Sequence, residues 1–459
     1  MLIRTRENVA SAGGLPSAPA VKRSLALLLL LSLTSGARAE GDAATPPAPA
    51  PAAARLPSVT GNPLNDFQFT GTGELGGWLG LPSGSPLRLG GVAVGNGTYQ
   101  LGGGTSPDTV NWAGFLALSL SLDLEKAVGW KGAKIGVAGL QYNVQPVNGA
   151  AGSVQGVNST VAVGPNNRTE LYNYLLAQNL FDDQLQLVAG KLIPTISFGN
   201  VAKPDPTAQS GDYAVPSLTG LIYTPIFVPP TMLGRIPGYP DSSLGIQGTI
   251  APKSLGGRFY LSAGVYDGRL GASGTNTGLV SPDLSGPLFS IAEVGGGWRI
   301  GSEQAPGQFA VGAWNQGGPL RAGTLTEGSA WGIYAQTSQR LANFRRGQDS
   351  SGLNLFLQAG WSPSTTNLIN ASIGGGLTVL GPFRSRPRDS YGLGVSWAQP
   401  NHRPEAGYGF NASELMIQAY AQFHFVANVF LEPVITTLPV VGFGKAPSTS
   451  ATLQLTAVF

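Results

Sequence analysis

The stretch GFLALSLSLDLEK, residues 114–126, places a leucine at every second position. The leucines are Leu116, Leu118, Leu120, Leu122 and Leu124, and the residues between them are Ala117, Ser119, Ser121 and Asp123. A period of two predicts a β-strand with one apolar face and one polar face. In a soluble sandwich the leucines would face a second sheet, whereas in a membrane barrel they would face lipid. The rest of the sequence has to decide between these two architectures.

Composition favours the membrane barrel. Charged residues make up 11% of the chain, against roughly 25% in an ordinary soluble protein. Glycine accounts for 67 of the 459 residues, about twice its usual share. No run of about eighteen or more apolar residues is present, so no transmembrane helix is predicted. Low charge, abundant glycine and no spanning helix are typical of a transmembrane β-barrel, with a glycine-rich secreted β-solenoid as the alternative.

The N-terminal segment predicts export. An apolar run, Ser24–Leu33, follows two basic residues, and small residues lead to a cleavage site after Ala39. This pattern is that of a signal peptide over residues 1–39. A Pro/Ala-rich linker is expected over residues 40–66, and the barrel is expected to occupy residues 67–459.

Removing the predicted signal peptide changes the charge of the chain. The full sequence has 27 basic and 24 acidic residues. The predicted mature chain has 22 basic and 23 acidic residues. The basic charge therefore belongs mostly to the signal peptide, and binding of nucleic acid loses its support. The chain has no cysteine, so a secreted protein of this length needs another source of stability. A closed barrel, in which every strand is paired, would supply it.

Alternating segments recur along the chain and predict sixteen strands, an even number as bacterial barrels require. They lie near 87–101, 112–125, 133–146, 169–179, 184–194, 243–251, 257–267, 290–301, 307–315, 329–339, 353–362, 367–380, 391–398, 412–425, 428–437 and 449–459. Several connections after odd-numbered strands are long, namely 146–168, 195–242, 268–289 and 399–411. Most connections after even-numbered strands are short. This asymmetry is typical of outer-membrane barrels, so we expect Leu116 to Leu124 to face lipid.

The two faces of the other strands differ in the same way. In segment 133–146 the apolar face holds Gly136, Ala138, Leu140, Tyr142 and Val144, and the polar face holds Gln141, Asn143 and Gln145. Near the C-terminus the polar faces hold Gln418, Tyr420, Gln422, His424, Thr452, Gln454 and Thr456. Amides, hydroxyls and aromatic groups suit a wall around a path for solutes, so we expect the polar faces to line a lumen.

A resemblance to a known family covers about residues 67–459. The segments that carry it are GELGGWLGL, LEKAVGWKGAKIGV, NRTELYNYLLAQNLFDDQLQLVAGKLIPT and LQLTAVF, of which the block Asn167–Thr195 is the most specific. They resemble the carbohydrate-selective porins of the OprB family. The resemblance implies a sixteen-stranded barrel in the outer membrane of a Gram-negative (diderm) bacterium. Monosaccharides and similar small solutes would diffuse through it passively into the periplasm, without a cofactor or energy coupling. An apolar outer wall would allow a homotrimer as well as a closed monomer.

The longest connection, residues 195–242, is the candidate constriction, folded into the barrel. Eight prolines restrict its backbone, and a loop this long without regular structure is disordered or functional. Aromatic rings offer flat surfaces for the C–H face of a sugar, and charged groups can bridge its hydroxyls. The candidate residues are Asp212, Tyr213, Tyr223, Arg235 and Tyr239. The alternative is a loop that covers the mouth or contacts a neighbouring subunit.

A second set of candidates lies on the fourth and fifth strands. Arg168 and Glu170 are two residues apart, so they share a face, and Tyr172 and Tyr174 continue it. If this face is lumenal, the wall opposite the loop carries an Arg/Glu pair and a row of tyrosines. The alternative is an exposed pair at a loop end with an aromatic girdle. Lys191 has the parity of the outward-facing Leu185 and Leu187. A bulge at Gly190 would turn it inward, and without one it would lie at the polar boundary.

The sequence contains no catalytic or metal-binding motif that we recognise. Its two histidines, His402 and His424, lie in different segments, and no set of His, Cys and Asp has the spacing of metal ligands. The sequence therefore predicts a passive, sugar-preferring porin and not an enzyme. The alternatives are a non-selective diffusion porin, an outer-membrane barrel enzyme that uses one of these histidines, and a non-porous anchor.

Overall fold

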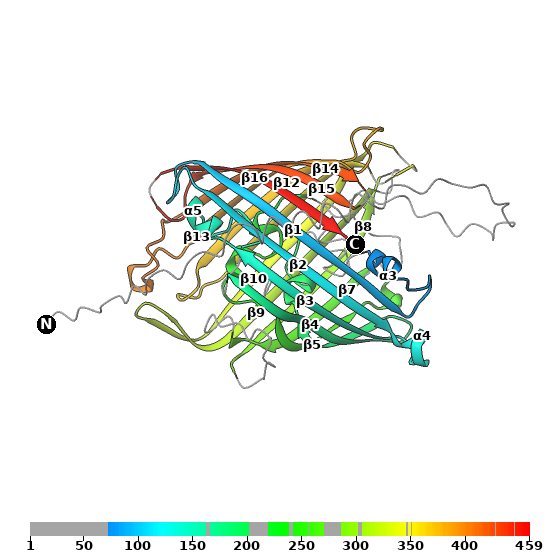
Figure 1. Cartoon of the computed structure of the whole chain (residues 1–459). Helices are drawn as coiled ribbons and strands as arrows, with labels where there is room; N and C mark the ends of the chain where they lie inside the picture. Colours follow the sequence, from blue (N-terminus) through cyan, green and yellow to red (C-terminus); the bar gives the residue numbers. More distant parts are fainter. Residues whose placement is uncertain are drawn as a thin grey trace. The chain divides into compact units, whose positions relative to one another are not determined.

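The chain forms a closed antiparallel barrel of sixteen strands (Figure 1). The computed structural model describes residues 72–161, 166–201, 219–237, 242–256, 258–269, 286–301, 305–345, 348–349, 351–426, 428–444 and 446–459. Each strand pairs with its neighbours in sequence, and β1 pairs with β16 to close the sheet. The predicted number of strands and the predicted barrel are therefore confirmed. The predicted signal peptide and linker lie outside the described residues.

The observed strands lie close to the predicted ones. They are β1 (Leu87–Gly102), β2 (Val110–Asp123), β3 (Ala133–Val144), β4 (Asn167–Leu180), β5 (Leu185–Leu192), β6 (Ser243–Ile250), β7 (Phe259–Asp267), β8 (Leu288–Ile300), β9 (Ala305–Ala322), β10 (Leu325–Asn343), β11 (Gly352–Trp361), β12 (Ile369–Leu380), β13 (Ser390–Pro400), β14 (Glu414–Val426), β15 (Val429–Val440) and β16 (Ser448–Val458). Strands β9 and β10 extend well beyond the predicted limits, 307–315 and 329–339, because they continue as a hairpin above the barrel wall.

The helices are short. They are α3 (Glu74–Trp78), α4 (Leu124–Val128), α5 (Val147–Ala151) and α6 (Pro194–Ser197), with 3-10 turns η3 (Thr224–Ile226), η4 (Pro230–Met232), η5 (Lys253–Leu255) and η6 (Pro404–Ala406). In the described part of the chain, no helix has the length and apolar character needed to cross a membrane.

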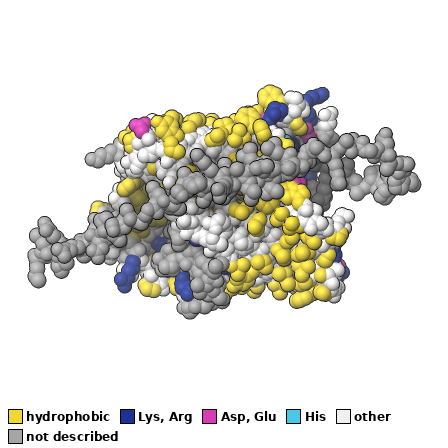
Figure 2. Space-filling model, in the orientation of Figure 1, with side chains coloured by type: hydrophobic (Ala, Val, Ile, Leu, Met, Phe, Trp, Pro, Cys, Tyr) yellow, Lys and Arg dark blue, Asp and Glu magenta, His cyan; other side chains and the backbone are white. Residues whose placement is uncertain are grey.

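The outer wall is apolar, as the alternation in β2 predicts. Leu118 and Leu120 are exposed on it, and Figure 2 shows hydrophobic side chains gathered in large patches on the described part of the wall. Leu124 is an exception to the prediction, because it is only 7% exposed. Asp123 ends the strand and caps α4 by accepting a hydrogen bond from the Lys126 backbone N–H. The strand alternation therefore stops at Asp123, and Leu124 is buried as the first residue of α4.

The predicted orientation of β3 is wrong. Tyr142 and Leu140 pair with the inward-facing Phe115 and Ala117 of β2 and are buried, while Gln141 is exposed on the outer wall. The prediction assumed that the lumen is filled with water. At the level of Leu140 and Tyr142 folded loops cover the inner wall, so an apolar face is stable inside. By contrast, the predicted inward faces of β14 and β16 are confirmed, since their amides and hydroxyls are buried.

Aromatic side chains mark both edges of the outer wall. At the short-turn end, which carries the turns after even-numbered strands, the exposed aromatic residues include Trp78, Trp130, Phe181, Phe259, Phe344, Phe383 and Phe425. At the opposite, long-loop end they include Trp331, Trp361 and Trp397. Two such girdles flank the apolar band of outer-membrane barrels, where aromatic rings lie at the level of the lipid headgroups.

Candidate functional site

Two loops fold into the barrel and meet there. The first is the predicted constriction loop, residues 195–242, whose described parts are 195–201, 219–237 and 242. Its backbone N–H groups at Ile222 and Tyr223 donate to Gln418 Oε1 on β14, at 2.8 and 3.0 Å. The loop starts at β5, which lies far around the barrel from β14, so it reaches Gln418 only through the interior. The predicted inward fold is therefore confirmed for these residues.

The second inward loop, residues 145–161 between β3 and β4, was not predicted. Glu414 of β14 holds it by accepting hydrogen bonds from Ser153 Oγ at 2.7 Å and Val154 N at 2.6 Å. The Gln155 backbone and side-chain N–H groups donate to the same carboxylate, both at 3.3 Å. The number of residues between the third and fourth predicted strands identified this connection as long. Its own sequence does not show that it folds inward, because its anchor, Glu414, is 260 residues away from Val154 along the chain.

Gln418 connects the two loops to each other and to the wall. Its Oε1 accepts from the constriction loop, and its Nε2 donates to Val157 O of the second loop at 3.0 Å and to Thr436 Oγ1 of β15 at 2.8 Å. The loops also pair directly, through Ser159 N to Ile222 O at 2.7 Å and Thr224 N to Gly156 O at 3.0 Å. One buried amide side chain and these backbone hydrogen bonds together fix the relative position of both loops.

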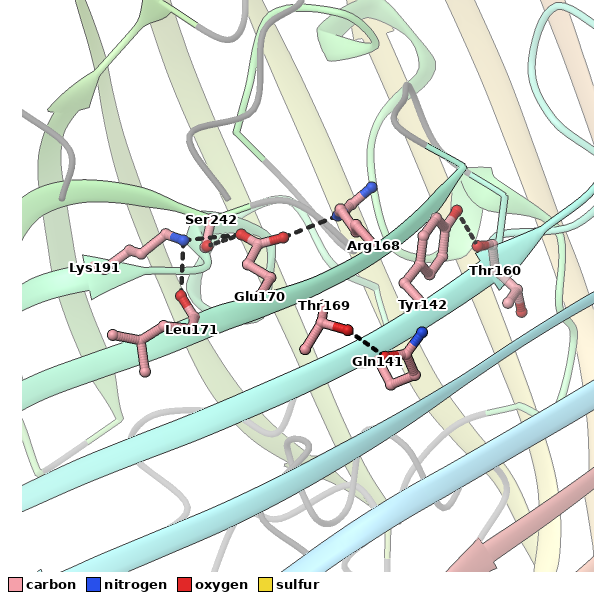
Figure 3. A network of polar contacts seen from close by, with 9 residues as sticks. All are labelled: Gln141, Tyr142, Thr160, Arg168, Thr169, Glu170, Leu171, Lys191 and Ser242. Atoms are coloured by element: carbon pink, nitrogen blue, oxygen red, sulfur yellow. Dashed lines mark hydrogen bonds and ion pairs between the residues drawn. The ribbon is translucent and has the colours of Figure 1, made fainter. Parts of the chain in front are cut away.

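Three predicted residues form a buried ionic cluster on β4 and β5 (Figure 3). The Glu170 carboxylate accepts from Arg168 Nε at 2.9 Å and from Lys191 Nζ at 2.8 Å. Lys191 also donates to Leu171 O at 2.8 Å, and Ser242 Oγ, at the end of the constriction loop, donates to Glu170 at 3.4 Å. Glu170 and Lys191 are each 1% exposed. The cluster therefore holds the wall and the loop end together and offers little surface to a solute.

The Arg168 guanidinium also lies over an aromatic ring. Its Cζ is 4.5 Å from the ring centroid of Tyr142, a cation–π distance. The Tyr142 hydroxyl in turn donates to Thr160 O of the second loop at 2.8 Å. The ionic cluster is thus linked to both inward loops, through Ser242 on one side and Tyr142 on the other.

Lys191 reaches the interior because the two strands are locally irregular. Gly190 has a φ of +142°, and a Cβ there would lie 2.1 Å from Tyr174 O, so only glycine fits. The register of β3 with β4 shifts at Tyr172. The shift leaves Tyr172 fully buried, while Tyr174 is partly exposed. Of the positions that the sequence leaves open for Lys191, the structure shows the inward one. The predicted continuation of the inward face to Tyr174 is wrong, because the irregularity at Tyr172 reverses the alternation.

A third buried carboxylate, Glu293 of β8, was not among the site candidates. It accepts from the hydroxyls of Tyr260 and Tyr334 at 2.7 and 2.8 Å, and from Gly199 N of the constriction loop at 3.2 Å. The sequence signal that could have identified it is an acidic residue at an inward position between apolar outward ones, since Ala292 and Val294 are both exposed.

The candidate residues of the constriction loop differ in their burial and in their contacts. Tyr223 is fully buried in the interior cluster, so it packs and does not present its ring to a solute. Arg235 donates to Asn367 Oδ1 at 2.8 Å and to Thr366 O at 2.7 Å, so it fastens the loop to the β11–β12 connection. Near it, burial raises the pKa of Tyr408, and the positive charge of Arg235 opposes that shift. The other three candidates, Asp212, Tyr213 and Tyr239, lie outside the described residues.

The arrangement shows no assembled catalytic site in the described part of the chain. His402 lies in the β13–β14 connection at the long-loop end, and His424 lies at the short-turn end of β14, beside Arg388. Among the described residues, no group of three His, Cys, Asp or Glu side chains could hold a metal ion. The buried side chains of Glu293, Glu414 and Gln418 hold the inward loops.

Comparison with known proteins connects this architecture to a family. Residues 109–436 match the carbohydrate-selective porin OprB family. The chain belongs to that family. Porin B of Pseudomonas aeruginosa is 24% identical over 361 residues, which cover 70% of this chain and 72% of that protein. The high-pH structure of Pseudomonas putida OprB shares the fold, with 17% identity, a TM-score of 0.68 and coverage of 83% of this chain and 97% of that one. Its low-pH structure gives a TM-score of 0.52 at 17% identity, covering 84% and 97%.

Membership of the OprB family establishes the general activity. The protein is an outer-membrane porin of a Gram-negative bacterium through which sugars diffuse. Its family and fold are those of a channel. The two girdles and the apolar wall between them are the physical counterpart of that location.

Proposed function

We propose that this porin selects monosaccharide-sized solutes at an aperture formed by the constriction loop and the second loop. The observation that supports this most directly is the hydrogen bonding of Gln418 to both loops. Two loops held by one side chain narrow the lumen from two directions. Because hydrogen bonds to backbone groups leave little freedom, the aperture keeps a fixed size, as a filter for small solutes requires.

The predicted site residues then divide into two roles. Glu170, Lys191 and Tyr223 are too deeply buried to contact a passing sugar, so they position the loops. Direct contacts with the sugar fall to Asp212, Tyr213 and Tyr239, which stay predictions. Their chemistry suits a pyranose, because the rings can stack on its C–H face and the carboxylate can accept from its hydroxyls.

Single-channel conductance in a planar bilayer tests this proposal. We expect a steady ohmic current that falls saturably as glucose is added from the long-loop side. In Gln418→Leu both loops lose their shared anchor, so we expect a larger conductance and weaker block by glucose. Gln422→Leu is the matched control, because Gln422 is buried on the same face of β14 and bonds Glu432 of the wall at 2.9 Å.

The possible results separate the competing functions. A current that no sugar affects would make this a general diffusion porin. A Gln418→Leu current equal to that of the natural protein would show that the loops do not set the aperture. We further propose that passage involves no catalytic step. The predicted homotrimer and the closed monomer both stay compatible with an apolar outer wall.

A further inference from the structure

The turn between β12 and β13, residues 381–389, concentrates positive charge at the short-turn end. Its sequence, GPFRSRPRD, places arginine at every second position, and Asp389 is the only acid. Arg384 is exposed and makes no ion pair within the described residues. The Arg386 side chain is 47% exposed. Arg388 contacts His424 Nε2 at 3.0 Å and donates to Asn428 Oδ1 at 3.2 Å, so it is engaged with the rim.

Neighbouring turns hold this turn in one conformation. Arg345, in the β10–β11 turn, donates to Gly381 O at 2.7 Å. The buried Asp389 carboxylate accepts from Arg386 and from His424 N, the latter at 2.9 Å. Arg386 Nη2 donates to His424 O at 3.0 Å. The Arg386 guanidinium is therefore preorganised, with part of its surface still open to water.

A row of aromatic rings runs down the outer wall from this turn. Phe383 is 55% exposed, and its ring centroid is 6.2 Å from that of Tyr391, which is 6.0 Å from that of Phe423. Both contacts are edge-to-face. Arg386 Cζ lies 5.8 Å from the Phe423 ring centroid. Tyr391 pairs with Ala421 on the outward face of the barrel. The Arg386 guanidinium therefore lies at the short-turn end of an apolar surface that faces lipid.

We propose that this turn and aromatic row bind one anionic phospholipid of the periplasmic leaflet. Arg384 and Arg386 would hold the phosphate, and the first part of an acyl chain would lie along Phe383, Tyr391 and Phe423. The position suits this ligand, because the turn lies at the level of the aromatic girdle, where headgroups are found. The charge suits it as well, since guanidinium groups pair well with phosphate oxygens. A free phosphate would use the arginines and leave the aromatic row without a role.

Native mass spectrometry of the mature protein in a neutral detergent tests this site. We expect one phosphatidylglycerol to be retained in preference to phosphatidylcholine with the same acyl chains. Each arginine near anionic lipid contributes about 1 kcal/mol, so we expect Arg384→Ala to lower retention about 5-fold and the double change with Arg386→Ala to lower it roughly 30-fold. Phe383→Ala should weaken retention by removing acyl contact. The matched control is the double change Lys131→Ala with Lys134→Ala. Both lysines are exposed, and they lie in the β2–β3 turn and at the start of β3, at the same end of the barrel.

Three results would overturn the proposal. Equal loss in the lysine control would mean attraction to the charge of the whole barrel end. Displacement of the lipid by millimolar inorganic phosphate, with Phe383→Ala unchanged, would mean a phosphate site without a lipid chain. Retention unaffected by Arg384→Ala would remove the turn from binding. Arg384→Ala does not disturb Asp389, so it stays informative if the double variant folds poorly, and unchanged channel conductance confirms its fold.

Discussion

Two buried carboxylates hold the interior of this barrel in opposite ways. Glu170 is 1% exposed and lies between two cations, Arg168 and Lys191. Glu414 is fully buried, and its donors among the described residues are a hydroxyl, two backbone N–H groups and an amide. The first carboxylate joins β4 to β5 and to the end of the constriction loop. The second joins β14 to the second loop.

The different partners of Glu170 and Glu414 predict different consequences when the negative charge is removed. Removing the carboxylate charge at Glu170 leaves two buried cations without compensation, and an unpaired buried charge is costly. Removing the charge at Glu414 leaves only neutral donors around it, and a neutral acceptor can still take hydrogen bonds from them. The ionic cluster therefore supports the stability of the barrel, whereas Glu414 mainly fixes the position of a loop. The following substitutions test that distinction.

The largest effect is expected for Glu170→Gln. The glutamine keeps the shape but not the charge, so we expect the free energy of unfolding to fall by about 3–5 kcal/mol. Urea-induced unfolding of the protein in lipid vesicles, followed by tryptophan fluorescence, measures it. The double variant Glu170→Gln with Lys191→Met removes one cation and should recover part of the loss. A loss below about 1 kcal/mol in the single variant would mean that the cluster behaves like an exposed pair.

A smaller effect on stability and a larger effect on the channel are expected at Glu414. Glu414→Ala removes the acceptor of several donors, so we expect a loss of about 1–3 kcal/mol and a higher single-channel conductance as the second loop is released. Glu414→Gln keeps an acceptor oxygen and should retain nearly the natural conductance. If the glutamine variant conducts like the alanine variant, the charge itself holds the loop, and the contrast with Glu170 fails.

The smallest effect is expected for an ion pair at the water-exposed end. Arg345 Nε donates to Asp349 Oδ2 at 2.6 Å in the β10–β11 turn. Burial alone would raise the pKa of Asp349, but hydrogen bonds from Ser351 and Arg345 outweigh it and lower the pKa from its ordinary value of 3.8. Its contribution to stability is therefore present above pH 3.8 and lost as the pH falls through the lowered value.

Melting of Asp349→Asn against pH measures this contribution. At neutral pH we expect the variant to be less stable by about 1 kcal/mol, because the asparagine loses its negative charge beside Arg345 in a pair whose two side chains are only 8% and 13% exposed. The difference should disappear in strong acid, where Asp349 is protonated in the natural protein as well. A difference that stays constant over this range would mean that the asparagine disturbs the turn by its shape and not by its charge.

The barrel itself could be read from the sequence because strand alternation is a local property. Leu116 to Leu122 face outward because each follows its neighbour by two residues. Gln418 and Gln454 face inward for the same reason. The long connections, the constriction loop and the Arg168–Glu170 pair were also found from short stretches of sequence.

The contents of the lumen were decided only by the tertiary structure. Leu140 and Tyr142 face inward because folded loops cover them there, which no period of two can show. The second loop is held by Glu414, 260 residues away from Val154, and the constriction loop by Gln418, 196 residues away from Ile222. Alternation fixes which face of a strand is apolar. Whether that face meets lipid or a folded loop depends on contacts that form only when the barrel closes.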